Sequence, residues 1–195
     1  GGPAGGSGGP AEGVSGSGIV SGGNQPDAAA LILSGTWQRD HVGWWLLMPN
    51  GSYPRNQWVI FNGITYLFDG NGYMVEGWID LGGHWYYLTP GSGAMAVGWI
   101  LVEGRWYYMN GDGTMAVGWI QPSDRWYYLN GDGAMAVGWI SAGGRWYYLN
   151  GDGSMATGWI LVEGKWYYLG EDGAMLANTT TPDHRVVGED GAWIQ

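Results

Sequence analysis

The 195-residue chain contains no cysteine and only seven lysine and arginine residues. Without cysteine, neither a disulfide framework nor a thiolate metal site can form, so packing or a bound ligand must hold the fold together. The formal net charge of −10 disfavours attraction to nucleic acid or anionic lipid and favours a cationic partner. The longest apolar run, Ala28 to Leu33, is too short to span a bilayer. We therefore expect neither nucleic-acid binding nor membrane insertion.

Aromatic residues are missing from the start of the chain. Residues 1–27 are rich in glycine, proline and serine, a composition that cannot bury enough apolar area to offset the entropy of ordering. This segment is predicted to be a flexible linker, and residues 28–36 a short apolar lead-in. The chain does not begin with methionine and no signal peptide precedes the linker, so we expect a processed form or a piece of a longer protein.

Tryptophan, in contrast, is abundant and regularly spaced. Fifteen tryptophans and 13 tyrosines are present, and seven of the tryptophans follow one another at steps of 20 or 21 residues. Six of these seven are followed by another tryptophan seven residues later, the exception being Thr65. A period near 20 indicates a small supersecondary unit that buries its apolar face only against its neighbours. The first tryptophans of the repeats are Trp37, Trp58, Trp78, Trp99, Trp119, Trp139 and Trp159; the second ones are Trp44, Trp85, Trp106, Trp126, Trp146 and Trp166.

Each repeat has the pattern of a β-hairpin. In residues 98–117, two short β-rich segments are separated by a glycine-containing turn. Asn110-Gly111 and the equivalent pairs at 130–131 and 150–151 are expected to supply positive-φ residues for a tight loop into the next hairpin. Forty glycines and the lack of any helical apolar period argue against an α-rich fold. The predicted fold class is all-β, a β-solenoid of stacked hairpins.

The aromatic residues are expected to share one face of each hairpin. Because side chains alternate along a strand, Trp106 and Tyr108 lie on one face while Tyr107 and Met109 lie on the other. If strand pairing brings Trp99 to the face of Trp106, two tryptophans and a tyrosine line a cleft against the neighbouring hairpin. Three aromatic walls around one space form a cage suited to a quaternary ammonium group.

The repeat sequence resembles a known family. Gly118-Trp119-Ile120, the run from Arg125 to Asn130 and the run from Asp132 to Trp139 are similar to the choline-binding (cell-wall-binding) repeat of Gram-positive surface proteins, autolysins and phage lysins. The resemblance extends from about Trp37 to Gln195. It divides the chain into a seven-repeat array at 37–178 and a C-terminal cap at 179–195.

The resemblance implies a left-handed solenoid that holds choline between successive hairpins. Each site would comprise two tryptophans of one repeat, a tyrosine of the next and a methionine at the base, with no cofactor and no catalytic residue. This implies a secreted, cell-surface protein that binds choline or phosphocholine on teichoic acid. The four implied sets are Trp78, Trp85, Met95 and Tyr108; Trp99, Trp106, Met115 and Tyr128; Trp119, Trp126, Met135 and Tyr148; and Trp139, Trp146, Met155 and Tyr168.

Two early junctions depart from the pattern. Thr65 removes one wall from the Trp58 junction, and Leu67 replaces the tyrosine that would complete the Trp37 junction. The segment 179–195 lacks paired tryptophans, so the last junction is expected to be a cap rather than a site.

Other interpretations of the aromatic residues remain open. The middle tyrosines, such as Tyr107 and Tyr127, share a face with aliphatic residues and are expected to fill the core. Related aromatic repeats bind glycans, although few planar polar residues accompany the tryptophans here. Stacked repeats could also join chains end to end, or exchange the Ala28 to Ser34 segment, into dimers or filaments.

Polar residues give no sign of catalysis or of a metal site. Asp112, Asp132 and Asp152 lie in Gly-Asp-Gly loops, where one carboxylate per loop suits a turn better than calcium. The three histidines are scattered without metal-ligand spacing. The basic residues that precede each Trp-Tyr-Tyr run are expected to be solvated, or to contact the phosphate of phosphocholine; they are Arg105, Arg125, Arg145 and Lys165.

Overall fold

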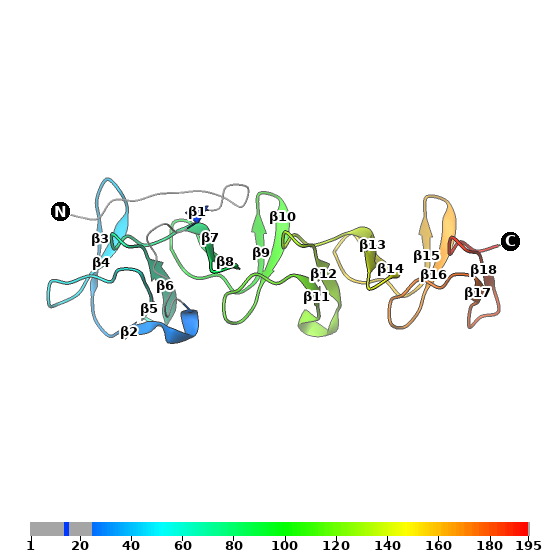
Figure 1. The fold of residues 1–195 in the computed structure, drawn as a ribbon, viewed down its shortest axis with the longest axis horizontal. Helices are drawn as coiled ribbons and strands as arrows, with labels where there is room; N and C mark the ends of the chain where they lie inside the picture. Colours follow the sequence, from blue (N-terminus) through cyan, green and yellow to red (C-terminus); the bar gives the residue numbers. More distant parts are fainter. Residues whose placement is uncertain (1–13, 16–24, 195) are drawn as a thin grey trace. The chain divides into compact units, whose positions relative to one another are not determined.

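The computed structural model describes residues 14–15 and 25–194. Short β-strands follow one another along the chain (Figure 1), and the helical segments within these residues are the two 3₁₀ turns η1 and η2. Across these residues no helix is long and apolar enough to cross a membrane. The elements are β1 (Val14–Ser15), η1 (Pro26–Ala28), β2 (Ala30–Ile32), β3 (Thr36–Arg39), β4 (Trp44–Leu47), β5 (Gln57–Phe61), β6 (Ile64–Phe68), β7 (Gly77–Leu81), β8 (His84–Leu88), β9 (Gly98–Val102), β10 (Arg105–Met109), β11 (Gly118–Ile120), η2 (Pro122–Asp124), β12 (Tyr127–Leu129), β13 (Gly138–Ala142), β14 (Arg145–Leu149), β15 (Gly158–Val162), β16 (Lys165–Leu169), β17 (Thr179–Thr180) and β18 (Val186–Val187).

Consecutive strands from β3 to β18 pair as hairpins, which confirms the predicted all-β class of repeated hairpins. Most hairpin tips are two-residue turns in which both residues have positive φ, for example Gly143 at 58° and Gly144 at 77°. Such turns match the twist of the flanking strands and favour glycine or asparagine. In the β11–β12 hairpin, η2 replaces the tight turn, and β11 and β12 have three residues each.

The loop after each hairpin differs from the prediction in one respect. Positive φ was expected at Asn-Gly pairs such as 150–151, but it occurs two residues later, at 81° for Gly153. The prediction was wrong because Asn150 opens a turn that the Gly153 N–H closes by donating to the Asn150 carbonyl at 2.8 Å. A Cβ on Gly153 would approach the Met135 sulfur to 2.3 Å, so close packing also requires glycine there.

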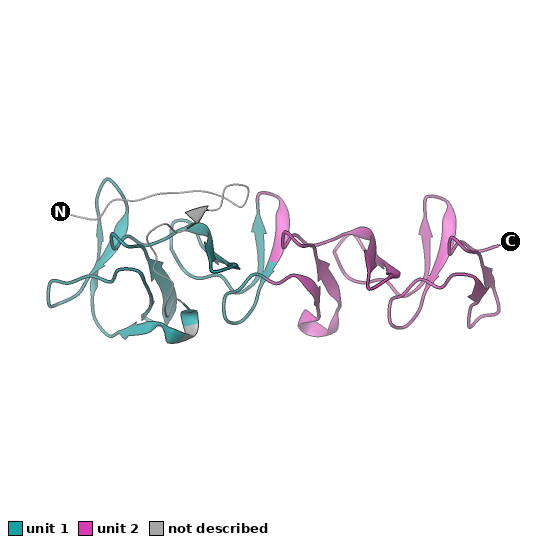
Figure 2. Ribbon diagram, in the orientation of Figure 1, with its two compact units in different colours: residues 1–102, 108–115 teal, residues 103–107, 116–195 magenta. Residues whose placement is uncertain are grey.

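The chain divides into two compact units (Figure 2): residues 1–102 with 108–115, and residues 103–107 with 116–195. In the second unit, one aliphatic side chain at the end of each hairpin's second strand is fully buried. These side chains are Leu129, Leu149, Leu169 and Val187. The small residues Ala136 and Ala156 are also buried, which shows how narrow this core is. A core this thin relies on contacts between successive repeats.

The first unit contains two parallel strand pairs that the repeat pattern did not predict. Strand β2 pairs with β5, and β1 pairs with β7, so two of the hairpins become three-stranded sheets. A hairpin edge carries unpaired backbone N–H and carbonyl groups, which a preceding extended segment can satisfy. The Tyr86 hydroxyl also donates to the Gln25 side chain at 3.0 Å. Most of the predicted linker, residues 1–27, lies outside the described residues.

Candidate functional site

A hairpin with the full repeat sequence presents its two tryptophans and its last tyrosine on one face. In β13–β14, Trp139 pairs directly with Tyr148, and Trp146 lies two residues before Tyr148 on the same strand. The opposite face carries Ile140, which pairs with Tyr147. The rings of Trp139 and Tyr148 meet edge to face, with centroids 5.2 Å apart. The alternation predicted from the sequence is therefore confirmed for this hairpin.

The next hairpin adds a further aromatic ring to this face. The Trp119 ring lies 4.8 Å from Tyr147, and the Trp139 ring lies 5.0 Å from Tyr167. Both contacts are edge to face, at 70° and 74°. The aromatic face of one hairpin thus meets the mixed apolar face of the next one. The ring that the next hairpin contributes is the middle tyrosine of its Trp-Tyr-Tyr run, which is half-buried at 147 and 167.

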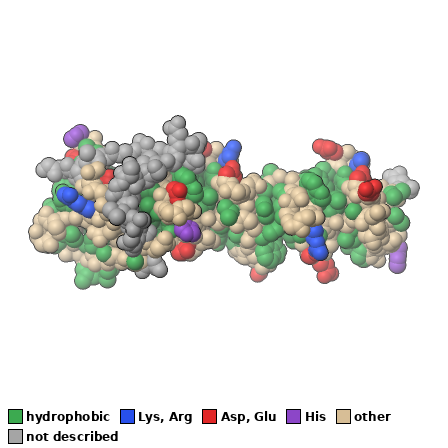
Figure 3. Space-filling view, in the orientation of Figure 1, with side chains coloured by type: hydrophobic (Ala, Val, Ile, Leu, Met, Phe, Trp, Pro, Cys, Tyr) green, Lys and Arg blue, Asp and Glu red, His purple; other side chains and the backbone are tan. Residues whose placement is uncertain are grey.

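The second tryptophan of the later repeats remains accessible to solvent. Trp126 is 41% exposed and Trp146 is 49% exposed, although each lies beside a less exposed first tryptophan. Hydrophobic side chains also reach the molecular surface along the repeats, with charged side chains at a few separate places (Figure 3). A large indole held at a junction and open to solvent is suited to contact a ligand.

Where a hairpin before β15–β16 has a second tryptophan, the backbone carbonyl of that residue accepts a hydrogen bond from a methionine in the loop after the next hairpin. The Met155 N–H donates to the Trp126 carbonyl and the Met175 N–H to the Trp146 carbonyl, both at 2.8 Å. In the first unit, the Met115 N–H likewise donates to the Trp85 carbonyl at 2.7 Å. Each methionine therefore belongs with the hairpin before its own.

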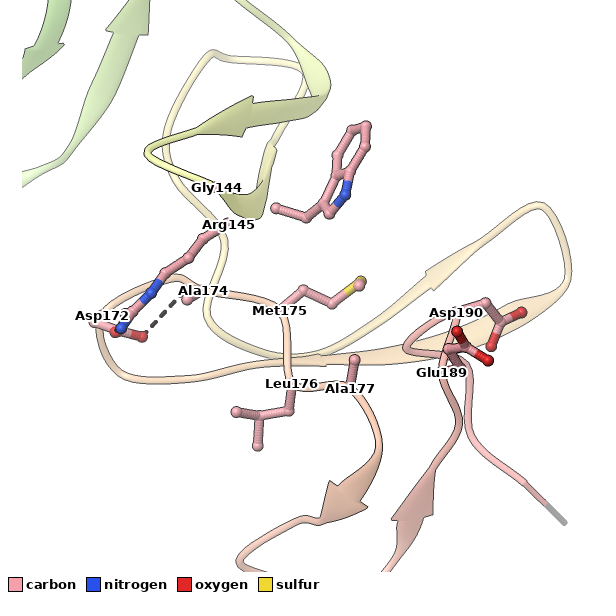
Figure 4. Close-up of a pocket in the computed structure, with 10 residues that line it drawn as sticks. Gly144, Arg145, Asp172, Ala174, Met175, Leu176, Ala177, Glu189 and Asp190 are labelled. Atoms are coloured by element: carbon pink, nitrogen blue, oxygen red, sulfur yellow. Dashed lines mark hydrogen bonds and ion pairs between the residues drawn. The ribbon is translucent and has the colours of Figure 1, made fainter.

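A pocket of about 470 Å³ opens at the Trp146 junction. In Figure 4, the Met175 side chain lies between the Arg145–Asp172 ion pair on one side and Glu189 and Asp190 on the other. The lining combines an indole and a thioether with three carboxylates and one guanidinium. The residues that line the pocket are Gly144, Arg145, Trp146, Asp172, Ala174, Met175, Leu176, Ala177, Glu189 and Asp190. Asp172 is paired with Arg145 and Asp190 with Lys165, so the charge of Glu189 is the one that favours a cationic ligand at this pocket.

The basic residues before the Trp-Tyr-Tyr runs form ion pairs with the loop that follows the next hairpin. Their partners are the aspartates of the Gly-Asp-Gly type loops, and every partner is more than half exposed. Exposed pairs of this kind contribute about 0–1 kcal/mol each. The pairs are Arg105–Asp132 at 3.3 Å, Arg125–Asp152 at 3.5 Å, Arg145–Asp172 at 3.0 Å and Lys165–Asp190 at 3.1 Å.

The loop aspartates have the turn role that the sequence predicts. The Ser154 hydroxyl and N–H both donate to Asp152 Oδ1, at 2.6 and 3.0 Å. These hydrogen bonds lower the pKa of Asp152, and the Arg125 guanidinium acts in the same direction. The Thr114 hydroxyl and N–H lower the pKa of Asp112 in the same way. Within residues 14–15 and 25–194, no three histidine or acidic side chains gather as metal ligands.

The early junctions are packed differently. Trp58 is 2% exposed and belongs to a core cluster with Leu67, Ile79, Tyr86 and Leu88. Its ring lies 5.2 Å from Tyr86, the contact that Trp119 makes with Tyr147. Where Thr65 stands instead of a second tryptophan, the junction is closed.

The structure groups the predicted site residues partly as expected. It brings the two tryptophans of a hairpin together, with centroids 6.3 Å apart both for Trp78 with Trp85 and for Trp119 with Trp126. The predicted tyrosines lie instead against the first tryptophan of their own hairpin. These contacts are Trp99–Tyr108, Trp119–Tyr128, Trp139–Tyr148 and Trp159–Tyr168.

The predicted methionines lie one junction earlier along the chain than the sets place them. The N–H groups of Met95 and Met135 donate to the carbonyls of Thr65 and Trp106, respectively. The middle tyrosines could have been chosen from the sequence by extending the alternation rule to the neighbouring hairpin. The sequence placed the middle tyrosines in the core, and Tyr86 and Tyr107 are indeed buried, at 0% and 4% exposed.

Comparison with known proteins identifies the repeats. The choline-binding repeat family model matches residues 56–98, 96–138 and 136–179. No curated protein sequence matches the chain.

Several solved structures from Streptococcus pneumoniae are similar. Choline binding protein F, solved in the presence of a peptidoglycan analogue, is 37% identical, with a TM-score of 0.77 over 83% of this chain and 58% of that one. CbpJ is 38% identical, with a TM-score of 0.76 and the same coverage. The modular autolysin LytC is 32% identical, with a TM-score of 0.64 over 82% of this chain and 37% of that one. The chain thus spans less than two thirds of these relatives. It belongs to the choline-binding repeat family.

Proposed function

We propose that this chain is a non-catalytic attachment module that binds choline groups at the junctions between its later hairpins. The observation that carries this proposal is the half-exposed second tryptophan, whose backbone carbonyl is bonded to a methionine N–H and whose hairpin also carries a first tryptophan in contact with the next hairpin's tyrosine. In the described residues this arrangement occurs at two complete junctions of the second unit. They comprise Trp119, Trp126, Tyr147 and Met155, and Trp139, Trp146, Tyr167 and Met175.

Cation–π attraction accounts for the binding. A trimethylammonium group is poorly hydrated, and each ring face within about 6 Å contributes about 0.5–2 kcal/mol. Two or three rings therefore give a single-site free energy of a few kcal/mol, and a millimolar dissociation constant corresponds to about −4.1 kcal/mol. At the Trp146 pocket the carboxylate of Glu189 favours the cation over a neutral ligand.

Firm attachment would come from several weak sites acting together. A teichoic acid displays many phosphocholine groups, so the second and later contacts become effectively intramolecular. The proposal therefore places the chain at the surface of a Gram-positive cell. The Trp78–Trp85 pair of the first unit, with ring centroids 6.3 Å apart, belongs to the same proposal.

Titration calorimetry with choline and with short glucans tests this function. We expect millimolar binding of choline at more than one site, together with a higher melting temperature because ligand binds the folded state. Tryptophan fluorescence should be quenched in the same range. Binding of glucan without choline would replace this proposal by a glycan-binding one, and binding of neither would refute both.

Whether the chain self-associates is tested alongside choline binding. Exchange of the Ala28 to Ser34 segment between chains would require β2 to leave its parallel pairing with β5. Light scattering with and without choline measures whether dimers or longer assemblies form. An unchanged monomer mass in both conditions would exclude assembly as part of the function.

A further inference from the structure

The last junction replaces two residues of the repeat at once. The bridge between Leu169 and Met175 in one repeat corresponds to the bridge between Val187 and Trp193 in the next. Trp193 therefore stands where the earlier repeats have methionine. Counting back two residues from Val187, Arg185 stands where the preceding repeat has Tyr167. The last repeat therefore has a cationic side chain, Arg185, at the position of the middle tyrosine, and an indole, Trp193, at the position of the methionine.

The two replacements meet in space. The Arg185 guanidinium lies over the Trp193 ring, 4.7 Å from its centroid, and 5.7 Å from the centroid of Trp159. The two indoles are 6.3 Å apart at an angle of 64°. The backbone N–H of Trp193 donates to the backbone carbonyl of Trp166 at 2.8 Å, as the backbone N–H groups of methionines do in the earlier repeats. The guanidinium therefore lies at the junction where the pattern would place a ligand.

A small polar network fixes the position of the guanidinium. Asp183 forms an ion pair with Arg185 Nε at 3.3 Å and accepts a hydrogen bond from Trp159 Nε1 at 3.1 Å. The hydroxyl of Thr181, which is 3% exposed, donates to the same carboxylate at 2.6 Å. The hydrogen bond from Thr181 contributes most to lowering the pKa of Asp183, so the carboxylate remains charged.

We propose that Trp159, Trp166 and Trp193 form a further site for a quaternary ammonium group, and that Arg185 occupies this site as an internal cation. A guanidinium and a trimethylammonium group are attracted to the same indole faces. An intramolecular cation acts at a high effective concentration, so a ligand of millimolar affinity does not displace it. The last junction is thereby closed without ligand. This inference rests on the proposed function of the earlier junctions.

Counting choline sites by titration calorimetry tests the proposal. Arg185→Ala and Arg185→Tyr remove the internal cation, and the tyrosine also restores the wall of the earlier repeats; each variant should bind one more choline than the wild type. Arg185→Lys keeps a cation and should leave the count unchanged. If wild type binds choline and both charge-removing variants keep its count, the inference is wrong while the proposed function stands. If no protein binds choline, both fail.

A measurement on the wild type is independent of whether the variants fold. Ring currents of Trp159 and Trp193 should shift the NMR signals of the Arg185 side-chain protons upfield, and millimolar choline should leave them there. Trp193→Ala should move these signals toward ordinary arginine values. Arginine signals that are unshifted in the wild type, or that lose their shift when choline is added, would overturn the proposal.

Discussion

The Trp58 junction and the Trp126 junction share one ring contact but differ at the position of the second tryptophan. Both place the first tryptophan edge to face with the middle tyrosine of the next hairpin, at 5.2 Å for Trp58 and 4.8 Å for Trp119. At the first junction Thr65 follows and Trp58 is buried; at the second Trp126 follows and is 41% exposed. At the Trp58 junction the second position therefore carries no indole, whereas the Trp126 junction presents one to solvent.

The early and the later hairpins also differ in what they bury. The early hairpins bury aromatic and aliphatic side chains in two clusters, one around Phe61 and Phe68 and one around Trp58 and Tyr86. The later hairpins bury one large aliphatic side chain per repeat beside small alanines, and they leave an indole partly exposed to solvent. Because apolar burial stabilises the folded state, we expect the early hairpins to be the more stable part in the absence of ligand.

Removing the buried tryptophan should have the largest effect. Trp58→Ala deletes an indole that is 2% exposed and leaves a cavity in its cluster, which should cost about 3–5 kcal/mol in the free energy of unfolding. Denaturant unfolding of the first unit's signal measures this loss. The number of choline sites should be the same as in the wild type, provided the protein is assayed well below its unfolding midpoint. A loss of one site would show that the Trp58 junction also binds.

Substituting the packed loop glycine should lower stability similarly in the early and the later hairpins, because in both this glycine packs against a methionine. A Cβ on Gly93 would lie 2.1 Å from the Met74 sulfur, and one on Gly153 would lie 2.3 Å from the Met135 sulfur. Both glycines have positive φ, so Gly93→Ala and Gly153→Ala should each cost about 1–3 kcal/mol.

Gly151→Ala is the matched control for the loop variants. Gly151 has no atom within 4 Å of an added Cβ and its φ is not positive, so its substitution should change stability by less than about 0.5 kcal/mol. The comparison uses thermal or denaturant unfolding of all three variants. Equal effects at 151 and 153 would contradict the close packing on methionine.

Removing an exposed tryptophan should affect binding more than stability. Trp126→Ala removes a partly exposed indole, which should cost about 1 kcal/mol of stability without ligand. It should delete one choline site from the titration, because one wall of the junction is lost. Thr65→Ala changes the equivalent position of the closed junction and should delete none. An unchanged count in Trp126→Ala would assign this indole to packing alone.

Much of the fold could be predicted from the sequence because the repeat is strict. The hairpins, the seven first tryptophans and the shared aromatic face follow from a period of 20 and from strand alternation. The parallel strand β2 could not be predicted, since nothing in Ala30–Ile32 specifies which hairpin edge it joins. That pairing depends on an edge that exists only in the folded chain.

The candidate site was harder to predict than the fold. The tryptophans follow from the pattern, but which tyrosine and which methionine accompany them depends on how one hairpin meets the next. Sequence spacing within a repeat does not contain that information. The role of Arg185 depends on the same packing, because the residue is recognisable only after alignment with Tyr167 through the bridges of the structure.

The smallest predicted effect concerns the loop carboxylates. Ser154 donates twice to Asp152, whereas the preceding loop has Ala134, whose N–H alone donates to Asp132. Ser154→Ala should therefore raise the pKa of Asp152 back toward its ordinary value, which NMR titration of its carboxyl carbon can measure. A carboxyl with a lowered folded pKa stabilises the fold above its unfolded pKa, near 3.8, and this contribution is lost as pH falls through the folded value. The variant should thus be slightly less stable than the wild type at pH 7 and lose less stability between pH 5 and pH 2. Because Asp152 is largely exposed, solvent screening keeps the difference small, and an equal pH dependence in both proteins would show that the hydroxyl contributes nothing.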